Sequence, residues 1–508
     1  MTERNLILPG NPRYQPKKLR EIFGYDNLYR CVAEVELANL NVLAEIGMIS
    51  QEAINALTPE IRQIIFDLPT SQIDRVEREI TKHDIRAWVR CVQEIISQNC
   101  GQYAEELNRW VHVPLTSYDA LDTARILQYK RAYELVLAPA IVEVIEMFSK
   151  MVRRFADEPM IGRTHGQHAL PITVGFWLAT ILDRIIYNAD QMKKNISYLK
   201  GKISGAVGAY NAQVKLGFNQ RSFQQSGLFV DDYSDSFNCK EHSYETRLLH
   251  ELGLMPGRIS TQILPPEPLA YFLFSAAMFS AALAQFGRDC RHLMRTEIGE
   301  IQETFEQHQV GSSTMAHKRN PINFENLEGM WLRTKNELGK VLDTLISEHQ
   351  RDLVGSSVAR DFPIILVNLV QQLDTLRRGE LGKRFLERLT VNNQALERNL
   401  ELNGHLIMAE PLYIALQMAG FTGDAHELIN RQLVPEAQKT GKPLVILLLE
   451  RHDSSALEEA VARIPESLLS AMMQPKTYTG LAQKRALAVA KTAENFISDY
   501  QDKTGKKE

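Results

Sequence analysis

The chain has 508 residues, of which 44% are hydrophobic and 24% are charged, and its formal net charge is −4. This composition is typical of a soluble globular protein, and the length predicts roughly two to four domains. The slight negative charge argues against a nucleic-acid-binding protein, because such proteins carry a basic excess on one surface.

Five cysteines are scattered along the chain without CxxC spacing: Cys31, Cys91, Cys100, Cys239 and Cys290. This pattern predicts neither a disulfide framework nor a zinc site, but buried reduced thiols as in a cytosolic protein. Residues 1–18 contain no long apolar stretch and no small-residue cleavage site, so they do not read as a signal peptide. We therefore expect a cytoplasmic protein.

Apolar residues recur at helical spacing from end to end of the chain. One long pattern runs over residues 119–156, and Pro139 inside it should kink or divide the helix. Thr116 and Asp119 are spaced as a capping box at its start.

Three more long helical patterns cover residues 173–199, 269–302 and 324–348, and convincing strand alternation is scarce. Helices of this length cannot bury their apolar faces alone, so they should form a bundle. We therefore predict an all-α protein of three helical domains. These are an N-terminal domain (1–115), a central long-helix bundle (116–365) and a C-terminal domain (366–508).

Residues 268–287 form a charge-free run that is long enough to span a bilayer. The run is rich in Ala and Ser and contains Gln285. We interpret it as a helix buried within a large helical bundle, and we expect no membrane association.

The segment from Gly311 to Asn326, GSSTMAHKRNPINFEN, combines a small-residue start with two adjacent cations, Lys318 and Arg319. A mobile loop that closes over an anionic substrate needs donors and cations of this kind. From the residues alone, a functional loop and a plain surface loop are equally good interpretations.

Other common sites are not supported. His165 and His168 are three residues apart, but no carboxylate or cysteine set accompanies them, so we predict no metal. The glycines of SGAVGAYNA do not follow GxGxxG, and no P-loop pattern is present.

The segment GSSTMAHKRNP resembles the signature loop of the fumarase/aspartase superfamily, usually written GSSxMPxKxNP. Ala316 departs from it where the superfamily usually has proline, which bears on the stiffness of the loop. Two further blocks resemble the superfamily in the same order: TSYD with DTA, from Thr116, and GRTHGQH, from Gly162.

Smaller details resemble the adenylosuccinate lyase family within that superfamily. Arg13 and Tyr14 are similar to its phosphate-contacting pair, although alone they would also suit a turn before a helix. His83 lies in a segment similar to the family's THD or NHD, although a lone histidine is more often simply a polar residue with its hydrogen bonds satisfied. The other matching positions are Lys82, Asp84, His112, Gln262, Asn326, Arg351, Ser356 and Arg360.

The resemblance implies elimination of fumarate from adenylosuccinate, giving AMP, and from SAICAR, giving AICAR, in purine nucleotide biosynthesis. It assigns Ser312 as the base, His165 as the acid and His83 as a catalytic neighbour. A serine is a poor base at its ordinary pKa, so it would need nearby cations and loop closure. An acid, a base and fixed charges suffice for this reaction, so no cofactor is expected.

The resemblance also implies a small-molecule succinyl-nucleotide site shared between the subunits of a homotetramer. Nucleotide contacts are expected from Arg13, Tyr14, Arg351, Ser356 and Arg360, and succinyl contacts from Thr116, Ser117, Lys318 and Asn320. Gln262 would lie near the scissile bond. The alternatives are a 3-carboxy-cis,cis-muconate cycloisomerase, another lyase of the superfamily, or a non-catalytic structural homologue.

Overall fold

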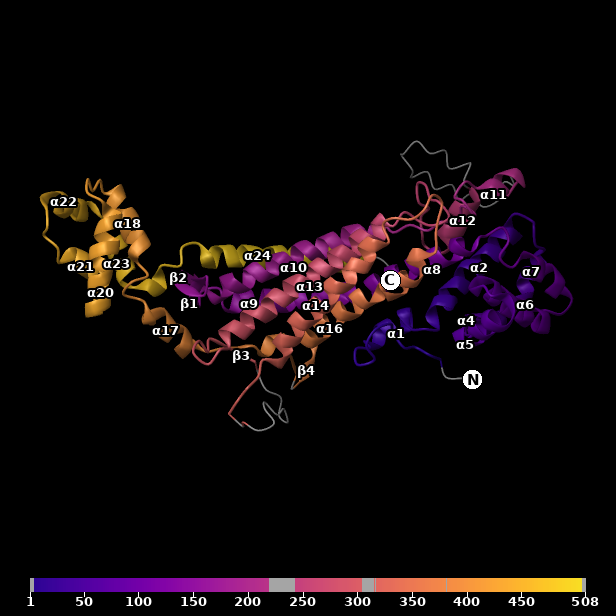
Figure 1. Cartoon of the computed structure of the whole chain (residues 1–508), viewed down its shortest axis with the longest axis horizontal. Helices are drawn as coiled ribbons and strands as arrows, with labels where there is room; N and C mark the ends of the chain where they lie inside the picture. The colour runs from indigo at the N-terminus through magenta and orange to yellow at the C-terminus, as the bar shows by residue number, and fades with distance from the viewer. Residues whose placement is uncertain (1–3, 219–242, 304–314, 316, 381, 505–508) are drawn as a thin grey trace. The chain divides into compact units, whose positions relative to one another are not determined.

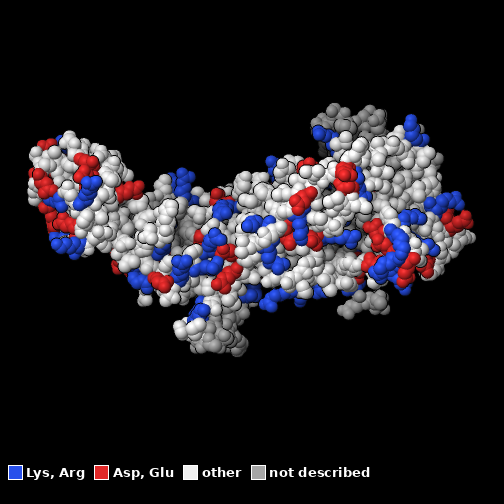
Figure 2. Space-filling view, viewed as in Figure 1, with Lys and Arg blue, Asp and Glu red and all other residues white. Residues whose placement is uncertain are grey.

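The computed structural model describes residues 4–218, 243–303, 315, 317–380 and 382–504. Helices dominate these residues and strands are few and short, so the predicted fold class is confirmed (Figure 1). On the face drawn in Figure 2, acidic and basic side chains are interspersed.

The chain divides into two compact units, each assembled from three segments. The first unit contains Met1–Ala140, Asn188–Ser280 and Met330–Gln371. The second contains Ile141–Tyr187, Ala281–Gly329 and Gln372–Glu508. The division into three domains made from the sequence stays a prediction.

The elements wholly within the first unit are mostly short helices. They are α1 (Lys17–Phe23), α2 (Asn27–Glu45), α3 (Gln51–Ala56), α4 (Pro59–Phe66), α5 (Thr70–Val76), η1 (Glu77–Thr81), α6 (Asp84–Asn99), η2 (Gly101–Tyr103), α7 (Ala104–Trp110), α8 (Ser117–Ala132), η3 (Tyr133–Leu137), α11 (Asn211–Lys215), α12 (Ser243–Glu251), α15 (Val354–Val358) and η5 (Ala359–Asp361).

The boundary between the two units falls within long helices. They are α9 (Ala138–Arg154), α10 (Val174–Ser197), α13 (Glu267–Leu293), α14 (Ile322–Asp343) and α16 (Pro363–Arg377).

The second unit contains the short strands and the C-terminal helices. They are β1 (Pro159–Thr164), β2 (Gln167–Thr173), β3 (Ile301–Gln302), β4 (Gly379–Glu380), β5 (Lys383–Arg384), η6 (Leu386–Arg388), β6 (Thr390–Val391), α17 (Asn393–Leu402), α18 (Ala409–Met418), α19 (Ala425–Glu427), η7 (Leu428–Leu433), α20 (Val434–Thr440), α21 (Leu444–Leu449), α22 (Ser455–Arg463), α23 (Glu466–Met473), η8 (Pro475–Thr477) and α24 (Ala482–Thr504).

An aromatic cluster joins four of the long helices inside the second unit. The Phe286 ring of α13 lies 5.0 Å from that of Phe148 in α9, 6.1 Å from Trp177 in α10 and 5.7 Å from Phe324 in α14. Next to it, a Cβ added at Gly287 would lie 2.7 Å from the backbone oxygen of Phe324. A glycine is needed here because α13 and α14 approach too closely for a side chain.

The helix predicted from residue 119 onwards begins at Ser117, and the predicted capping box is confirmed. The Thr116 backbone N–H donates to the Asp119 carboxylate at 2.9 Å. A π-helical turn, Tyr133–Leu137, separates α8 from α9 just before Pro139, which confirms the predicted division. Proline lacks the N–H that would continue the regular hydrogen-bond ladder.

Two predicted helix ends are wrong. The helix predicted over 269–302 ends at Leu293, because the following residues form a turn and Ile301 pairs with Val391 between β3 and β6. The helix predicted to reach residue 348 ends at Asp343. The pattern predicted over 173–199 corresponds closely to α10.

Among the described helices, α13 alone is long and apolar enough to cross a membrane, and 61% of its most apolar window is buried within the protein. That burial is what a core helix shows. The four described cysteines are likewise buried and free, as predicted.

Candidate active site

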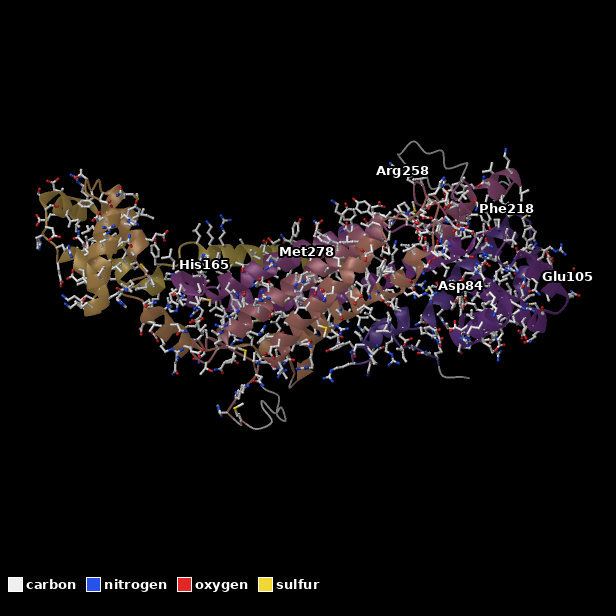
Figure 3. All side chains as sticks on the ribbon, in the orientation of Figure 1. Asp84, Glu105, His165, Phe218, Arg258 and Met278 are labelled. Carbon is white, nitrogen blue, oxygen red and sulfur yellow. The ribbon has the colours of Figure 1, made fainter. Side chains whose placement is uncertain are left out.

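His165 lies at the tip of the β1–β2 hairpin, which the sequence analysis missed (Figure 3). Thr164 pairs with Gln167, so His165 and Gly166 form a two-residue turn, with φ of 52° and 76°. Positive φ at both central residues is the mark of a type I′ hairpin turn. The turn leaves the His165 imidazole exposed.

A buried ion pair anchors this hairpin close to its tip, where Arg163 pairs with His168 across the strands. Arg163 donates to both carboxylate oxygens of Glu300, at 2.9 and 2.7 Å, and Asn399 donates to the same carboxylate at 2.8 Å. Glu300 is fully buried. Beside the pair, burial and the Arg163 charge lower the pKa of His168. The position of His165 therefore depends on a rigid support.

The signature loop is described only in part. Ser312 lies outside the described residues, whereas Lys318 and Asn320 directly precede α14. Lys318 is exposed and Asn320 is half-buried. Asn326 lies in the first turns of α14 and is half-buried.

Two predicted nucleotide contacts, Arg351 and Ser356, come together with Gln262 in the first unit. Arg351 donates from Nη1 to the Gln262 side-chain oxygen at 2.9 Å and from Nη2 to the Ser356 hydroxyl at 3.4 Å. Its Nε donates to the carbonyl of Asp352 at 3.2 Å. The guanidinium plane is thus fixed along its edge.

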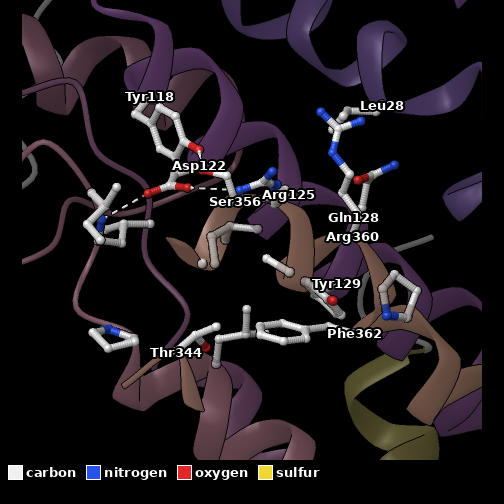
Figure 4. A pocket seen from close by; sticks show the side chains of 18 of the residues that line it. Leu28, Tyr118, Asp122, Arg125, Gln128, Tyr129, Thr344, Ser356, Arg360 and Phe362 are labelled. Atoms are coloured by element: carbon white, nitrogen blue, oxygen red, sulfur yellow. Dashed lines mark hydrogen bonds and ion pairs between the residues drawn. The ribbon is translucent and has the colours of Figure 1, made fainter. Parts of the chain in front are cut away.

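Arg351 and Ser356 line a cavity of about 830 Å³, a volume that suits a nucleotide-sized ligand, and Figure 4 shows Ser356 among the lining residues. Arg360 lines the same cavity. So do Asp122 and Arg125, which lie 3.6 Å apart. Burial raises the pKa of Asp122, while Arg125 and the Leu264 N–H act against that shift.

Tyr118 also lines this cavity, and the sequence analysis gave it no role. Its ring lies under the Arg351 guanidinium, and its hydroxyl is 2.8 Å from the Ser356 hydroxyl. A helical spacing was available as a signal, because Tyr118, Asp122 and Arg125 are four and three residues apart on α8.

The N-terminal pair lies before α1. Arg13 is exposed, and the Tyr14 ring lies 4.9 Å from the Arg333 guanidinium carbon. Arg333 was not predicted from the sequence. Its contact with Tyr14 places a second cation beside the proposed phosphate pair.

His83 and Lys82 are at the junction of η1 and α6. Lys82 has a φ of 54°, and the His83 Nδ1 lies 3.2 Å from the Asp84 carboxylate. The His83 side chain is about half-exposed, at 48%. Both groups are therefore open to a ligand.

His112 and the Thr116–Ser117 pair flank the start of α8. His112 has a φ of 69° and contacts Glu36 at 2.7 Å. Burial opposes protonation of His112, but the charge and hydrogen bond of Glu36 raise its pKa overall. Such left-handed backbone is uncommon outside glycine, and Lys82, His112 and His165 all adopt it.

The predicted residues divide between the two units. Gln262, Arg351 and Ser356 are joined directly, and His83 contacts Asp84. Within the described ranges, no hydrogen bond or ion pair links His165, Lys318 or Asn320 to another predicted site residue. His165, Lys318, Asn320 and Asn326 belong to the second unit, and the other described site residues to the first.

The described groups suit proton transfer and anion binding. Imidazoles titrate near neutral pH, and a guanidinium held in a plane matches a phosphate or carboxylate. Among the described residues, no cluster of three or more His, Cys, Asp or Glu has the arrangement of a metal site.

A family model described as "Lyase" matches residues 16–228 and 235–334, so the chain belongs to this lyase family, of the fumarase/aspartase superfamily. Two solved structures share its fold. The 3-carboxy-cis,cis-muconate lactonizing enzyme from Pseudomonas putida has a TM-score of 0.75 at 23% identity, covering 95% of this chain and 98% of that one. Fumarate lyase from Mesorhizobium sp. BNC1 has a TM-score of 0.72 at 21% identity, covering 97% and 99%.

Within the family, the chain groups with the adenylosuccinate lyases. The adenylosuccinate lyase of Pyrococcus abyssi is 31% identical over 502 residues, covering 97% of this chain and 99% of the relative. That of Methanocaldococcus jannaschii is 32% identical over 499 residues, covering 97% of each chain.

Proposed function

We propose that the chain eliminates fumarate from adenylosuccinate and from SAICAR, in purine nucleotide biosynthesis. The observation that carries this proposal is the hydrogen-bonded cluster of Arg351, Gln262 and Ser356, of which Arg351 and Ser356 line a nucleotide-sized cavity. Full-length similarity to adenylosuccinate lyases supports the same substrate class.

In the proposed reaction, Ser312 removes a proton from the carbon next to a succinyl carboxylate, and His165 protonates the departing nitrogen. The exposed turn at His165 supports its role, because an acid must reach the substrate. His83 holds the substrate near that acid. Lys318 and Asn320 stabilise the doubly charged carboxylate that forms.

We propose the remaining roles from the same resemblance. Arg13 and Tyr14 meet the nucleotide phosphate, and Arg351, Ser356 and Arg360 also contact the nucleotide. Thr116 and Ser117 hold the succinyl carboxylates, and Gln262 lies near the scissile bond. Lys82, Asp84, His112 and Asn326 complete the binding site.

A homotetramer with shared sites is the proposed assembly. Tyr271, Phe274 and Met278 recur at helical spacing on α13, and their side chains are exposed. Such a stripe marks a contact surface. The proposed residues also come from two compact units of the chain, which suits a site completed by neighbouring subunits. Buried free cysteines support a cytoplasmic location.

The roles are tested with Ser312→Ala and His165→Ala. Each is expected to lower the rate of fumarate release by at least about a hundredfold, the scale of a lost general acid or base. Light scattering should give both variants the wild-type mass. A near-normal rate in either variant would overturn the corresponding role.

A further inference from the structure

Tyr118 contacts two of the proposed nucleotide-binding residues, Arg351 and Ser356. The Arg351 guanidinium carbon lies 3.4 Å from the centre of its ring. The Tyr118 hydroxyl lies 2.8 Å from the Ser356 hydroxyl. One buried side chain, 7% exposed, thus touches both residues, and Figure 4 shows it beside Ser356.

The hydrogen bonds of Arg351 hold its guanidinium in place and leave part of it able to bind a ligand. Asp352, Gln262 and Ser356 each take one of its five N–H groups, and the Tyr118 ring covers one face. Among the described contacts, one N–H on each terminal nitrogen is left over. Two parallel N–H groups match two oxygens of a phosphate.

Charged side chains lie around the Tyr118 ring. The Arg125 guanidinium carbon lies 5.8 Å from its centre, and Arg125 is 3.6 Å from the Asp122 carboxylate. A tyrosine ring attracts cations over its face, so it can hold Arg351 without neutralising it. A carboxylate in the same place would compete with the phosphate for that charge.

We propose that Tyr118 is a positioning residue that fixes Arg351 and Ser356 for a phosphomonoester. This inference rests on the proposed function and deepens it. Tyr118 is the variable position of the TSxD block, so the block itself does not demand a tyrosine there. A guanidinium held in place beforehand loses less conformational freedom when the phosphate binds.

The test compares Tyr118→Leu, which removes ring and hydroxyl, with Tyr118→Phe, which removes the hydroxyl alone. AMP binding is measured by titration calorimetry, and the inhibition constant of fumarate is measured alongside kcat and KM. Tyr118→Leu should weaken AMP binding and raise the KM by about tenfold, and Tyr118→Phe by about threefold. The kcat and the fumarate constant should stay within about twofold.

Tyr413→Leu is the matched control, because Tyr413 is partly exposed on α18 and is not among the residues that line the cavity. It should leave AMP binding unchanged. Unchanged AMP binding in Tyr118→Leu, or equal losses for AMP and fumarate, would overturn the inference. If Tyr118→Leu does not fold, the same two criteria apply to Tyr118→Phe. Wild-type protein that binds AMP without cleaving adenylosuccinate would defeat the proposed function only.

Discussion

At the scale of single residues, the candidate site combines strained backbone with rigid supports. His165 adopts left-handed backbone at a hairpin tip, and the hairpin is anchored through Arg163 to buried Glu300. Strained backbone persists only where surrounding contacts determine it. The position of the acid candidate therefore depends on Arg163 and Glu300.

Glu300→Ala should lower the free energy of unfolding by about 3–5 kcal/mol, because it leaves the Arg163 charge partly buried without its carboxylate. Urea denaturation measures the loss. Glu146→Ala is the control, since its pair with Lys150 is exposed and should contribute far less. Equal losses in the two variants would contradict the account.

The sequence named candidate site residues, but it could not give the contacts between them. Gln262, Arg351 and Ser356 were named from a resemblance, and the structure brings them together. The role of Tyr118 was missed because its partner Ser356 is 238 residues away along the chain. The spacing of neighbouring residues in the sequence cannot predict a contact between residues so far apart along the chain.

At the scale of elements, long helices were predictable and strand pairs were not. Many apolar residues contribute to the helical spacing in α10 and α14. The sequence therefore located both helices within a few residues of their observed ends. The β1–β2 hairpin has a register shift between Ile161 and Arg163, which breaks the alternation that reveals a strand. Its His-Gly turn is also not the common Asn-Gly.

Helix α12 is tied to the segment before α11 by one buried carboxyl. Glu245 accepts hydrogen bonds from the Ile203 N–H at 2.6 Å and the Tyr210 hydroxyl at 2.7 Å. Burial raises the pKa of Glu245 from 4.5 to about 7. Between these values the folded chain binds more protons than the unfolded chain, so this group makes stability fall as pH rises.

Glu245→Gln should make the free energy of unfolding depend less on pH in this range. The free energy of unfolding of the wild type should fall by up to about 3 kcal/mol more than that of the variant between pH 4.5 and pH 8. This follows from a pKa shift of roughly 2.5 units in the wild type. Denaturation at both pH values measures the difference. An identical pH profile for the two proteins would show that Glu245 titrates normally.

At the scale of the whole molecule, the boundary between the two compact units has no signal in the sequence. The boundary between the compact units falls inside α9, α10, α13, α14 and α16, where no linker composition marks it. Domain boundaries are predicted from a sequence by the composition of the linkers between domains. The proposed assembly rests on the exposed apolar side chains Tyr271, Phe274 and Met278 of α13.

Phe274→Glu should break the proposed tetramer, because it puts a charge into an apolar contact repeated in every subunit. Light scattering should give a smaller mass, and fumarate release should fall with it. Met418→Glu is the control, since Met418 is exposed on α18. A full-size, active Phe274→Glu assembly would rule out α13 as the contact surface.

The most direct test is to supply the purified chain with adenylosuccinate and, separately, with 3-carboxy-cis,cis-muconate, each without added metal or nicotinamide. The account predicts that adenylosuccinate yields AMP and fumarate in equal amounts, while the muconate is left unchanged. Turnover of the muconate with adenylosuccinate untouched would contradict it, and would mean that the Arg351 cluster serves a substrate without a nucleotide.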